Sequence, residues 1–357
     1  MAITDKGYLC VLLCAFLIPA VVIAAPQVPC YFIFGDSVFD NGNNNYQLTV
    51  AKVNYPPYGV DFPTGPTGRF SNGRNLPDFV ANLLGFTNYI PPFATSGRGR
   101  GVLQGLNYAS GGSGILNETG TQMGGIISLH NQLKNHGVTV SNVEKLLGNK
   151  EAAKRYLNKC IYSIGIGAND YINNYFRPQY YNSSKQFNPQ QFADHLIRAY
   201  TGHIMTLYNY GARKVALFGI GQIGCTLREI GEFHAQGCVP ELNNAAKLFN
   251  ERLISLVDQL NRNSKISKFT YINIYGSETT DFKSLGIKVV NASCCEVAQG
   301  QELCLPYRTP CKNRNEYLFW DLVHTTEAMD LLLAKKAYGS PFPTDAYPIN
   351  LSELARL

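Results

Sequence analysis

Hydrophobic positions follow two alternating patterns along the chain. Short runs rich in aromatic and β-branched residues predict buried strands, and stretches with apolar residues at i, i+3, i+4 and i+7 predict helices between them. The predicted strands are CYFIF (30–34), LNYA (106–109), CIYSIGIG (160–167), KVALFG (214–219), FTYINIY (269–275) and YLFW (317–320). The predicted helices cover 76–84, 192–207, 240–261 and 326–338. Strands that alternate with helices of this length predict parallel β-α-β units and an α/β fold.

The first 25 residues have the pattern of a secretory signal peptide. A basic residue, Lys6, precedes the apolar run 8–23, and Ala24 and Ala25 offer a cleavage site. The run is short for a membrane span of about 20 residues, and no second apolar stretch follows. We therefore expect a secreted, extracellular protein, with 1–25 removed, 26–357 forming one domain, and no transmembrane segment in the mature chain.

The cysteines agree with export. Two of the ten lie in the predicted signal peptide, and the other eight are Cys30, Cys160, Cys225, Cys238, Cys294, Cys295, Cys304 and Cys311. An even number in an exported chain predicts disulfides. The pairs Cys225/Cys238 and Cys304/Cys311 would close short loops, although the four late cysteines permit other choices. No C-x-x-C and no histidine at ligand spacing accompanies them, which disfavours zinc, and we expect no metal.

Four Asn-x-Ser/Thr sequons fit a secreted glycoprotein. Their asparagines are Asn117, Asn182, Asn291 and Asn350. The 31 basic and 25 acidic side chains give a net charge of +6 with no block of like charges, so we do not expect nucleic acid as a partner. A weak attraction to acidic polysaccharide, such as that of a cell wall, or to anionic lipid stays open.

Two short blocks contain the parts of a Ser-His-Asp site. Ser37 comes directly after the first predicted strand, and a helix beginning there would help to stabilise an oxyanion. An ordinary turn serine or helix cap is the alternative for this residue. Asp321 lies three residues before His324, so its carboxylate can bond one ring nitrogen and leave the other facing a nucleophile.

Two further blocks supply candidate oxyanion donors. In GIGAND (165–170), glycines let the chain turn sharply after a predicted strand, and Asn169 can then aim its amide into the same cleft. In NYASGGSG (107–114), a glycine exposes a backbone N–H without obstruction. The tyrosines Tyr55 and Tyr58 would suit a groove wall, but ordinary packing is the simpler interpretation.

These four blocks resemble those of the GDSL-type lipases and esterases of the SGNH hydrolase superfamily, in particular the plant secreted branch. The resemblance runs from about residue 31 to about residue 339 and includes GRFSNGRNLPDF (68–79), whose role we expect to be mostly structural. It implies a three-layer α/β/α sandwich with a mostly parallel, flavodoxin-like sheet. It also implies hydrolysis of carboxylic esters, either lipid acyl esters or acylated small molecules and polysaccharides, without a metal or an organic cofactor.

The resemblance also implies roles for single residues. Ser37 matches the nucleophile, His324 the general base, and Asp321 the residue that orients it. The oxyanion hole would consist of the Ser37 N–H, Asn169 and the N–H of Gly111 or Gly112, of which the spacing from the start of the block favours Gly112. Two positions depart from the family: Thr325 and Gln222 replace common prolines, and Thr325 puts the rigidity of the histidine loop in question.

Two other functions remain open at this stage. The same acyl-enzyme would give a transacylase if a hydroxyl group replaced water. The second alternative is a secreted binding or defence glycoprotein with an idle site. An idle site tends to lose its nucleophile or base, whereas this chain has all four residues, Ser37, Asn169, Asp321 and His324. The G-x-G-x-x-G at 219–224 resembles a dinucleotide fingerprint, but the segment after it is poor helix material, so we expect no nucleotide cofactor.

Overall fold

A computed structural model describes residues 25–357 except 98, 265, 267 and 277–280, so almost all of the predicted signal peptide lies outside the described residues. Its main sheet has the strand order β1-β2-β3-β4-β7. Strands β1 to β4 are parallel, and β7 pairs antiparallel with β4. The strands are β1 Tyr31–Gly35, β2 Ile161–Gly165, β3 Lys214–Phe218, β4 Lys268–Ile272 and β7 Ala346–Tyr347.

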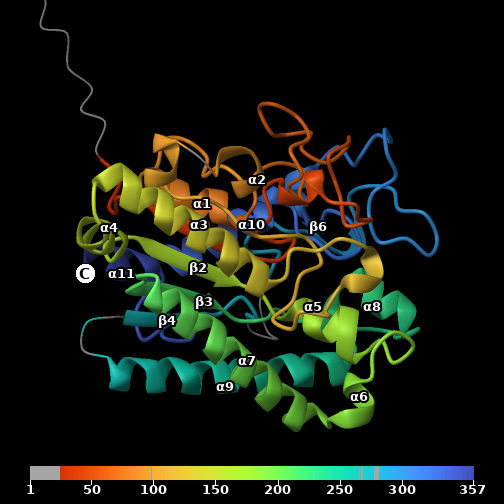
Figure 1. Ribbon diagram of the computed structural model, residues 1–357. Helices are drawn as coiled ribbons and strands as arrows, with labels where there is room; N and C mark the ends of the chain where they lie inside the picture. The colour runs from red at the N-terminus through yellow and green to blue at the C-terminus, as the bar shows by residue number, and fades with distance from the viewer. Residues whose placement is uncertain (1–24, 98, 265, 267, 277–280) are drawn as a thin grey trace, which may run out of the picture.

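Helices cover both faces of this sheet (Figure 1). Alternate residues of β1 divide between two cores, because successive strand side chains point to opposite faces. Tyr31 and Ile33 pack with residues of α1, α10 and α11, whereas Phe32 and Phe34 pack with residues of α3, α7 and α9. These helices are α1 Leu76–Leu83, α3 Leu129–Leu147, α7 Pro189–Asn209, α9 Pro240–Asn263, α10 Glu327–Gly339 and α11 Leu351–Arg356. The predicted three-layer, mostly parallel α/β fold is confirmed.

Local sequence signals set the ends of the main helices. Asn75 caps α1 and Asn188 caps α7, each in a reciprocal capping box and each followed by an early proline. Thr326 caps α10 through its side chain. The shorter helices are α2 Phe93–Ser96, α4 Lys150–Leu157, α5 Ala168–Asp170, α6 Ser183–Gln186 and α8 Leu227–Glu232, and Tyr171–Tyr175 forms one π-helical turn.

Two predicted strands differ from the prediction. Residues 106–109 form only isolated bridges beside β1, because the backbone leaves the strand direction at Gly105, where φ is +111°, and again at the turn after Ser110. Residues 317–319 do form a strand, β6 (Tyr317–Phe319), but it pairs with β5 (Val289–Ser293) in a separate two-stranded sheet. The chain reverses directly after β6, where the Trp320 N–H donates to the His324 carbonyl, so β6 does not extend the main sheet.

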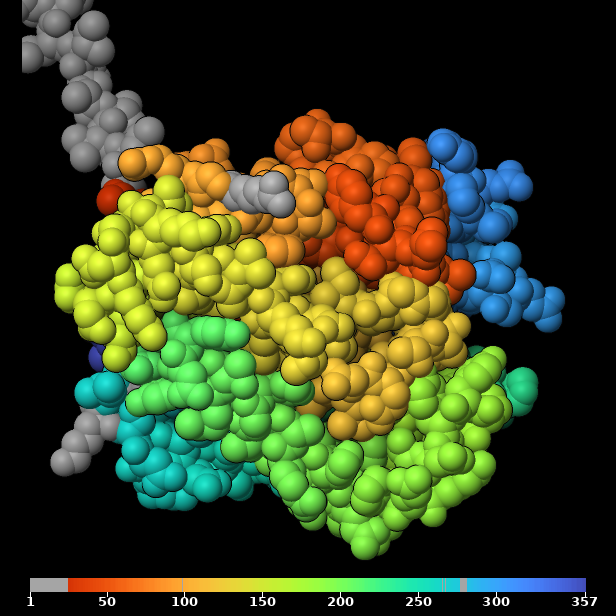
Figure 2. All heavy atoms as spheres, viewed as in Figure 1, coloured from red at the N-terminus to blue at the C-terminus, as the bar shows by residue number. Residues whose placement is uncertain are grey.

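The late part of the chain packs against an early segment at one end of the molecule. In Figure 2 the light-blue atoms of residues near 300 lie beside the orange-red atoms of residues near 50. This contact is a third apolar cluster, in which Tyr58 and Phe70 pack with Trp320 and with cysteines 294, 295 and 304. Residues more than 200 positions apart therefore build one wall of the molecule.

Four disulfides join the eight cysteines. The bonds are Cys30–Cys160, Cys225–Cys238, Cys294–Cys311 and Cys295–Cys304. The predicted closure of Cys225 with Cys238 is confirmed, and that of Cys304 with Cys311 is wrong. The Cys311 N–H donates to the Cys294 carbonyl, which places Cys311 beside Cys294 and leaves Cys304 to Cys295. Among the described residues, no helix is both long enough and apolar enough to cross a membrane.

Candidate active site

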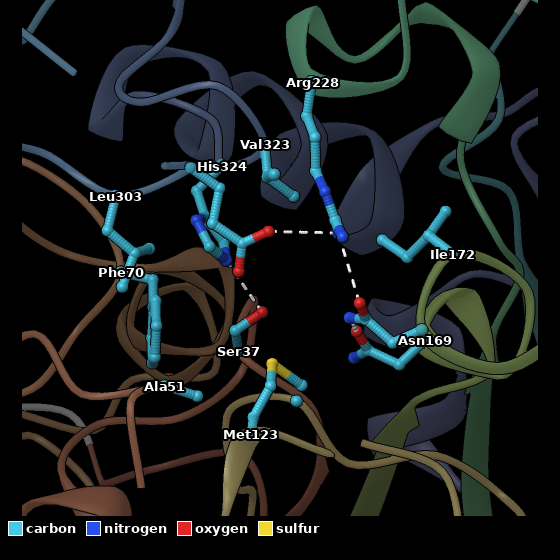
Figure 3. A pocket seen from close by; sticks show the side chains of 13 residues that line it. Ser37, Ala51, Phe70, Met123, Asn169, Ile172, Arg228, Leu303, Val323 and His324 are labelled. Atoms are coloured by element: carbon cyan, nitrogen blue, oxygen red, sulfur yellow. Dashed lines mark hydrogen bonds and ion pairs between the residues drawn. The ribbon is translucent and has the colours of Figure 1, made fainter. Parts of the chain in front are cut away.

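The carboxyl ends of β1 and β2 bring the predicted site residues together. Ser37 lies two residues after β1, and Asn169 lies in α5, directly after β2. Asp321 and His324 enter from the loop between β6 and α10. Ser37, Asn169, His324 and Gly112 all line one pocket, of about 330 Å³ including its open mouth (Figure 3). The site therefore sits where ligands bind in open α/β sheets.

Ser37, His324 and Asp321 form a hydrogen-bonded chain. The Ser37 Oγ lies 2.8 Å from the His324 Nε2, and the His324 Nδ1 lies 2.8 Å from the Asp321 Oδ2. The Asp321 carboxylate is fully buried, and its Oδ1 accepts the N–H groups of Val323 and His324. This arrangement fixes the imidazole with one nitrogen toward a carboxylate and the other toward a hydroxyl.

Two opposing influences set the pKa of His324. Burial of the ring lowers the pKa, because it disfavours the charged imidazolium, while the charge of Asp321 and the hydrogen bond to it raise the pKa. The pKa of His324 lies above the ordinary histidine value of 6.5. His324 is therefore a stronger base than a free histidine, which suits it to take a proton from a hydroxyl group.

Two aromatic side chains complete the surroundings of this pair. The Tyr58 hydroxyl donates to the Asp321 Oδ2 at 2.7 Å and accepts the Cys304 N–H at 3.1 Å. The ring of Phe70 lies 4.8 Å from that of His324. From the sequence, Tyr58 was expected to contribute to packing, and the block containing Phe70 was expected to be mostly structural. No motif links either residue to the histidine, so their part in the site was missed.

The expected helix at Ser37 does not form. Residues after Ser37 make a turn, in which the Asp40 N–H donates to the Asp36 carbonyl at 2.9 Å. The cause is Asp40, because its buried carboxylate accepts the N–H groups of Gly42 and Asn43 and holds the chain in a loop. Within the described part of the chain, the Ser37 N–H has no hydrogen-bond acceptor, so it is free to donate to a ligand.

The structure distinguishes the two candidate glycines. The Gly111 N–H donates to the Asp40 Oδ2 at 3.1 Å, so it is already engaged. Gly112 lines the pocket, and among the described residues its N–H has no acceptor. Its φ is +80°, a backbone conformation that residues with a Cβ rarely adopt, so this position favours glycine.

Asn169 points its amide toward the same space. Its Nδ2 donates to the Ser113 carbonyl at 3.1 Å, and its Oδ1 accepts from the Asn173 Nδ2 at 2.6 Å. An amide nitrogen carries two hydrogens, so one remains available for a ligand oxygen. The pocket thus offers three donors near Ser37: two backbone N–H groups and this amide.

The two departures from the family's prolines have local replacements. The Thr325 hydroxyl donates to the Asp330 Oδ1 at 2.6 Å, which ties the residue after His324 to α10. Burial raises the pKa of Asp330 well above its ordinary value. The Gln222 Nε2 donates to the Tyr275 carbonyl at 3.1 Å. A side-chain hydrogen bond therefore holds each loop at the position where the family has a rigid ring.

The sequons divide into two kinds. Asn117, Asn182 and Asn291 are exposed. Asn350 is buried and caps α11, where its Oδ1 accepts the Glu353 N–H and its Nδ2 donates to the Ser340 carbonyl. A sugar attached to the Asn350 Nδ2 would need room that this buried position does not offer.

The fold and the pocket define a class of protein. A strand-end serine that is hydrogen-bonded to a buried histidine–aspartate pair, with N–H donors opposite, is the arrangement used for acyl transfer from esters. The family model described as GDSL-like Lipase/Acylhydrolase matches residues 31–337. The chain belongs to this family, and it is an ester hydrolase.

Curated plant proteins resemble the chain over nearly its whole length. The Arabidopsis thaliana protein GDSL esterase/lipase At1g29670 is 50% identical over 340 residues, which cover 94% of this chain and 93% of the relative. GDSL esterase/lipase At5g45670 from the same plant is 49% identical over 339 residues, 93% of each chain. GDSL esterase/lipase At1g29660 is 49% identical over 341 residues, 94% of this chain and 93% of the relative.

Proposed function

We propose that the protein is a secreted serine hydrolase of carboxylic esters that works through a covalent acyl-enzyme on Ser37. The observation that carries this proposal is the chain of two 2.8 Å contacts from the Ser37 Oγ through His324 to Asp321. Ser37 is half-buried and lines the pocket, so its hydroxyl can meet a substrate carbonyl. Asp321 is fully buried. Burial is compatible with its proposed role, because Asp321 orients and stabilises His324 and does not contact the substrate.

The proposed reaction has two halves. The Ser37 Oγ attacks the ester carbonyl while the His324 Nε2 takes its proton, and the imidazolium is stabilised by Asp321. Collapse of the tetrahedral intermediate expels the alcohol, which receives the proton from His324. Water, deprotonated by His324, then attacks the acyl-enzyme and releases the acid together with free Ser37. The intermediate's oxygen is held by the N–H groups of Ser37 and Gly112 and by the Asn169 amide.

The pocket suggests which part of a substrate is recognised. Apolar side chains of Ala51, Met123, Ile172, Leu303 and Val323 line it beside the reacting groups. The volume of about 330 Å³ includes the open mouth, so the enclosed part of the pocket is smaller than that. We infer that a short acyl group fits inside, and that a longer chain would extend out of the mouth.

A chain-length series tests the hydrolase and this inference together. p-Nitrophenyl esters from acetyl to long acyl chains would be given to the mature protein and to Ser37→Ala and His324→Ala. We expect both variants to lose nearly all turnover while remaining folded, with the wild type preferring short chains. Ser141→Ala, an exposed serine on α3, is the matched control and should keep full activity. Turnover that survives in Ser37→Ala would overturn the proposal.

The proposal of secretion rests on other features. The apolar run before residue 25, the four disulfides and the exposed sequons support it together. We expect the protein recovered from the medium of secreting plant cells to begin after residue 25. We further expect it to carry glycans on Asn117, Asn182 and Asn291 and not on Asn350. Peptide mass spectrometry before and after glycan removal would identify the N-terminus and the glycosylated asparagines. A mature chain that still contains residues 1–25, or a glycan on Asn350, would contradict the proposal.

A further inference from the structure

We propose that Asn173 and Arg228 are positioning residues that fix which way round the amide of Asn169 lies. The inference rests on the proposed function, in which Asn169 donates to the oxyanion. An asparagine amide can point either its nitrogen or its oxygen into the pocket, and only the nitrogen can stabilise negative charge. Asn173 and Arg228 line the same pocket, and the contact that they make with the Asn169 oxygen therefore decides whether Asn169 helps or hinders the reaction.

A continuous line of contacts runs from Glu302 through Arg228 and Asn173 to Asn169, and Figure 3 shows Arg228 and Asn169 in the pocket. The Glu302 Oε2 pairs with the Arg228 Nη1 at 3.0 Å, and the same nitrogen donates to the Asn173 Oδ1 at 3.2 Å. The Asn173 Nδ2 then donates to the Asn169 Oδ1 at 2.6 Å. Asn169 and Asn173 are 5% and 4% exposed, so water does not compete freely for these groups.

The guanidinium of Arg228 sets the donor and acceptor orientation of this whole line of contacts. A guanidinium has five N–H donors and no acceptor, so the amide group that faces Arg228 must be the oxygen of Asn173. The nitrogen of Asn173 then faces Asn169 and must meet an oxygen. The nitrogen of Asn169 is left to face the Ser113 carbonyl and the pocket. One arginine thus sets the orientation of two amides in series.

The reversed orientation would harm the reaction. It would put the Asn169 oxygen against the Ser113 carbonyl and against the developing oxyanion, in both cases acceptor against acceptor. A partly exposed asparagine without such a line could sample both orientations. Arg228 and Asn173 prevent this at a site that water barely reaches.

The surrounding backbone holds both positioning residues in place. Asn173 lies in the π-helical turn Tyr171–Tyr175, where its φ of −125° departs from helical values, and such turns often occur at functional sites. Arg228 lies in the first turn of α8, and its N–H donates to the Leu322 carbonyl in the histidine loop at 2.9 Å. The line therefore joins the histidine loop to the oxyanion donor.

Asn173→Asp tests the inference with almost no change in shape. A carboxylate can still accept from Arg228, which favours a folded protein, but it cannot donate to the Asn169 oxygen. Asn169 would then turn its nitrogen toward the carboxylate and away from the pocket. We expect kcat on p-nitrophenyl acetate to fall toward the loss caused by Asn169→Ala, about 10²–10³-fold for a missing oxyanion donor. KM should change little.

A double-mutant cycle separates positioning from general damage. If Asn173 acts through Asn169, then Asn173→Asp should have almost no further effect on kcat in the Asn169→Ala background. An equal loss in both backgrounds would overturn the inference. Failure of the proposed function looks different, because Asn169→Ala alone would then leave kcat unchanged.

Variants of Arg228 provide a second test of the inference. This test also applies if Asn173→Asp does not fold. Arg228→Lys keeps a donor without an acceptor and should retain most of kcat, whereas Arg228→Met should lower kcat at unchanged KM. Arg252→Met, which removes a partly exposed ion pair between α9 and α7, is the matched control and should leave kcat unchanged. Equal kcat values for the lysine and methionine variants would overturn the role of Arg228.

Discussion

In the proposed mechanism, each functional side chain has one neighbour that limits what it can do. Asp321 holds the His324 Nδ1 at 2.8 Å, Tyr58 holds Asp321 at 2.7 Å, and Asn173 holds the Asn169 oxygen at 2.6 Å. These contacts select one tautomer and one amide orientation from several possible ones. At the scale of single residues, the proposed catalysis therefore depends on the donors and acceptors that contact the reacting groups.

The raised pKa of His324 predicts the acidic limb of the pH profile. His324 must be neutral to act as a base, so kcat/KM should rise with pH through the His324 pKa, with a midpoint above 6.5. Asp321→Asn removes the charge that raises the pKa, so its midpoint should move to lower pH. By analogy with other triads, kcat should also drop by about 10⁴-fold. A midpoint that does not move in this variant would contradict the assignment of the limb.

Tyr58 predicts an effect on both stability and activity. Tyr58→Phe removes a buried hydroxyl that serves Asp321 and the Cys304 N–H, and leaving buried polar groups unpaired costs about 1–3 kcal/mol of the free energy of unfolding. With one donor fewer, the Asp321 carboxylate should attract the imidazolium more strongly and raise the His324 pKa further. Denaturant unfolding and the acidic limb measure the two effects. Tyr46→Phe, an exposed tyrosine, should change neither.

At the scale of elements, local patterns predicted β1 to β4 and the helices α1, α7, α9 and α10, but they missed the long helix α3. The ends of α1, α7 and α10 follow from caps and prolines in the sequence, and β1 to β4 from short apolar runs. The strand β5 has mostly exposed residues, so no apolar run marked it. The pairing of β6 with β5 and the failure of 106–109 to form a full strand depend on distant partners, which local patterns do not contain.

The first turn of α1 contains a buried ion pair whose loss should be costly. The Arg69 guanidinium donates to both oxygens of Asp78, and the Asp78 carboxylate also accepts the Asn75 N–H of the capping box. Asp78→Asn would leave a buried arginine without its counter-charge, which costs about 3–5 kcal/mol. Chemical denaturation should show this loss. Glu353→Gln, in the capping box of α11, should cost clearly less, because among the described residues Glu353 has no arginine partner.

At the scale of the whole molecule, the site was predicted only where the sequence carries local blocks. Ser37, Asn169 and the Asp321–His324 pair lie in such blocks, and the fold brings these blocks to one pocket. The spacing of its block already favoured Gly112 over Gly111, and the contact of the Gly111 N–H with Asp40, 71 positions away, agrees with that prediction. Tyr58 and Arg228 reach the site from 263 and 55 positions away along the chain, measured to Asp321 and Asn173. No motif encodes such contacts.

The disulfides predict a ranking of global stability. Cys30 and Cys160 are 130 residues apart and join the starts of β1 and β2, whereas Cys225 and Cys238 are 13 apart. In the chain-entropy model, the long closure contributes about 4–5 kcal/mol and the short one about 3 kcal/mol. Replacing each pair with alanines and measuring unfolding in denaturant compares them. A larger loss for the 225–238 pair would contradict this ranking.

The most direct test of the account is to identify the residue that forms the covalent intermediate. The mature enzyme would be treated with a fluorophosphonate, which phosphonylates activated serines, and the labelled peptide would be mapped by mass spectrometry. We predict one label per molecule, on Ser37, with turnover lost in proportion to labelling and the reaction strongly slowed in His324→Ala. A label on another residue, or full turnover after Ser37 is fully labelled, would contradict the account.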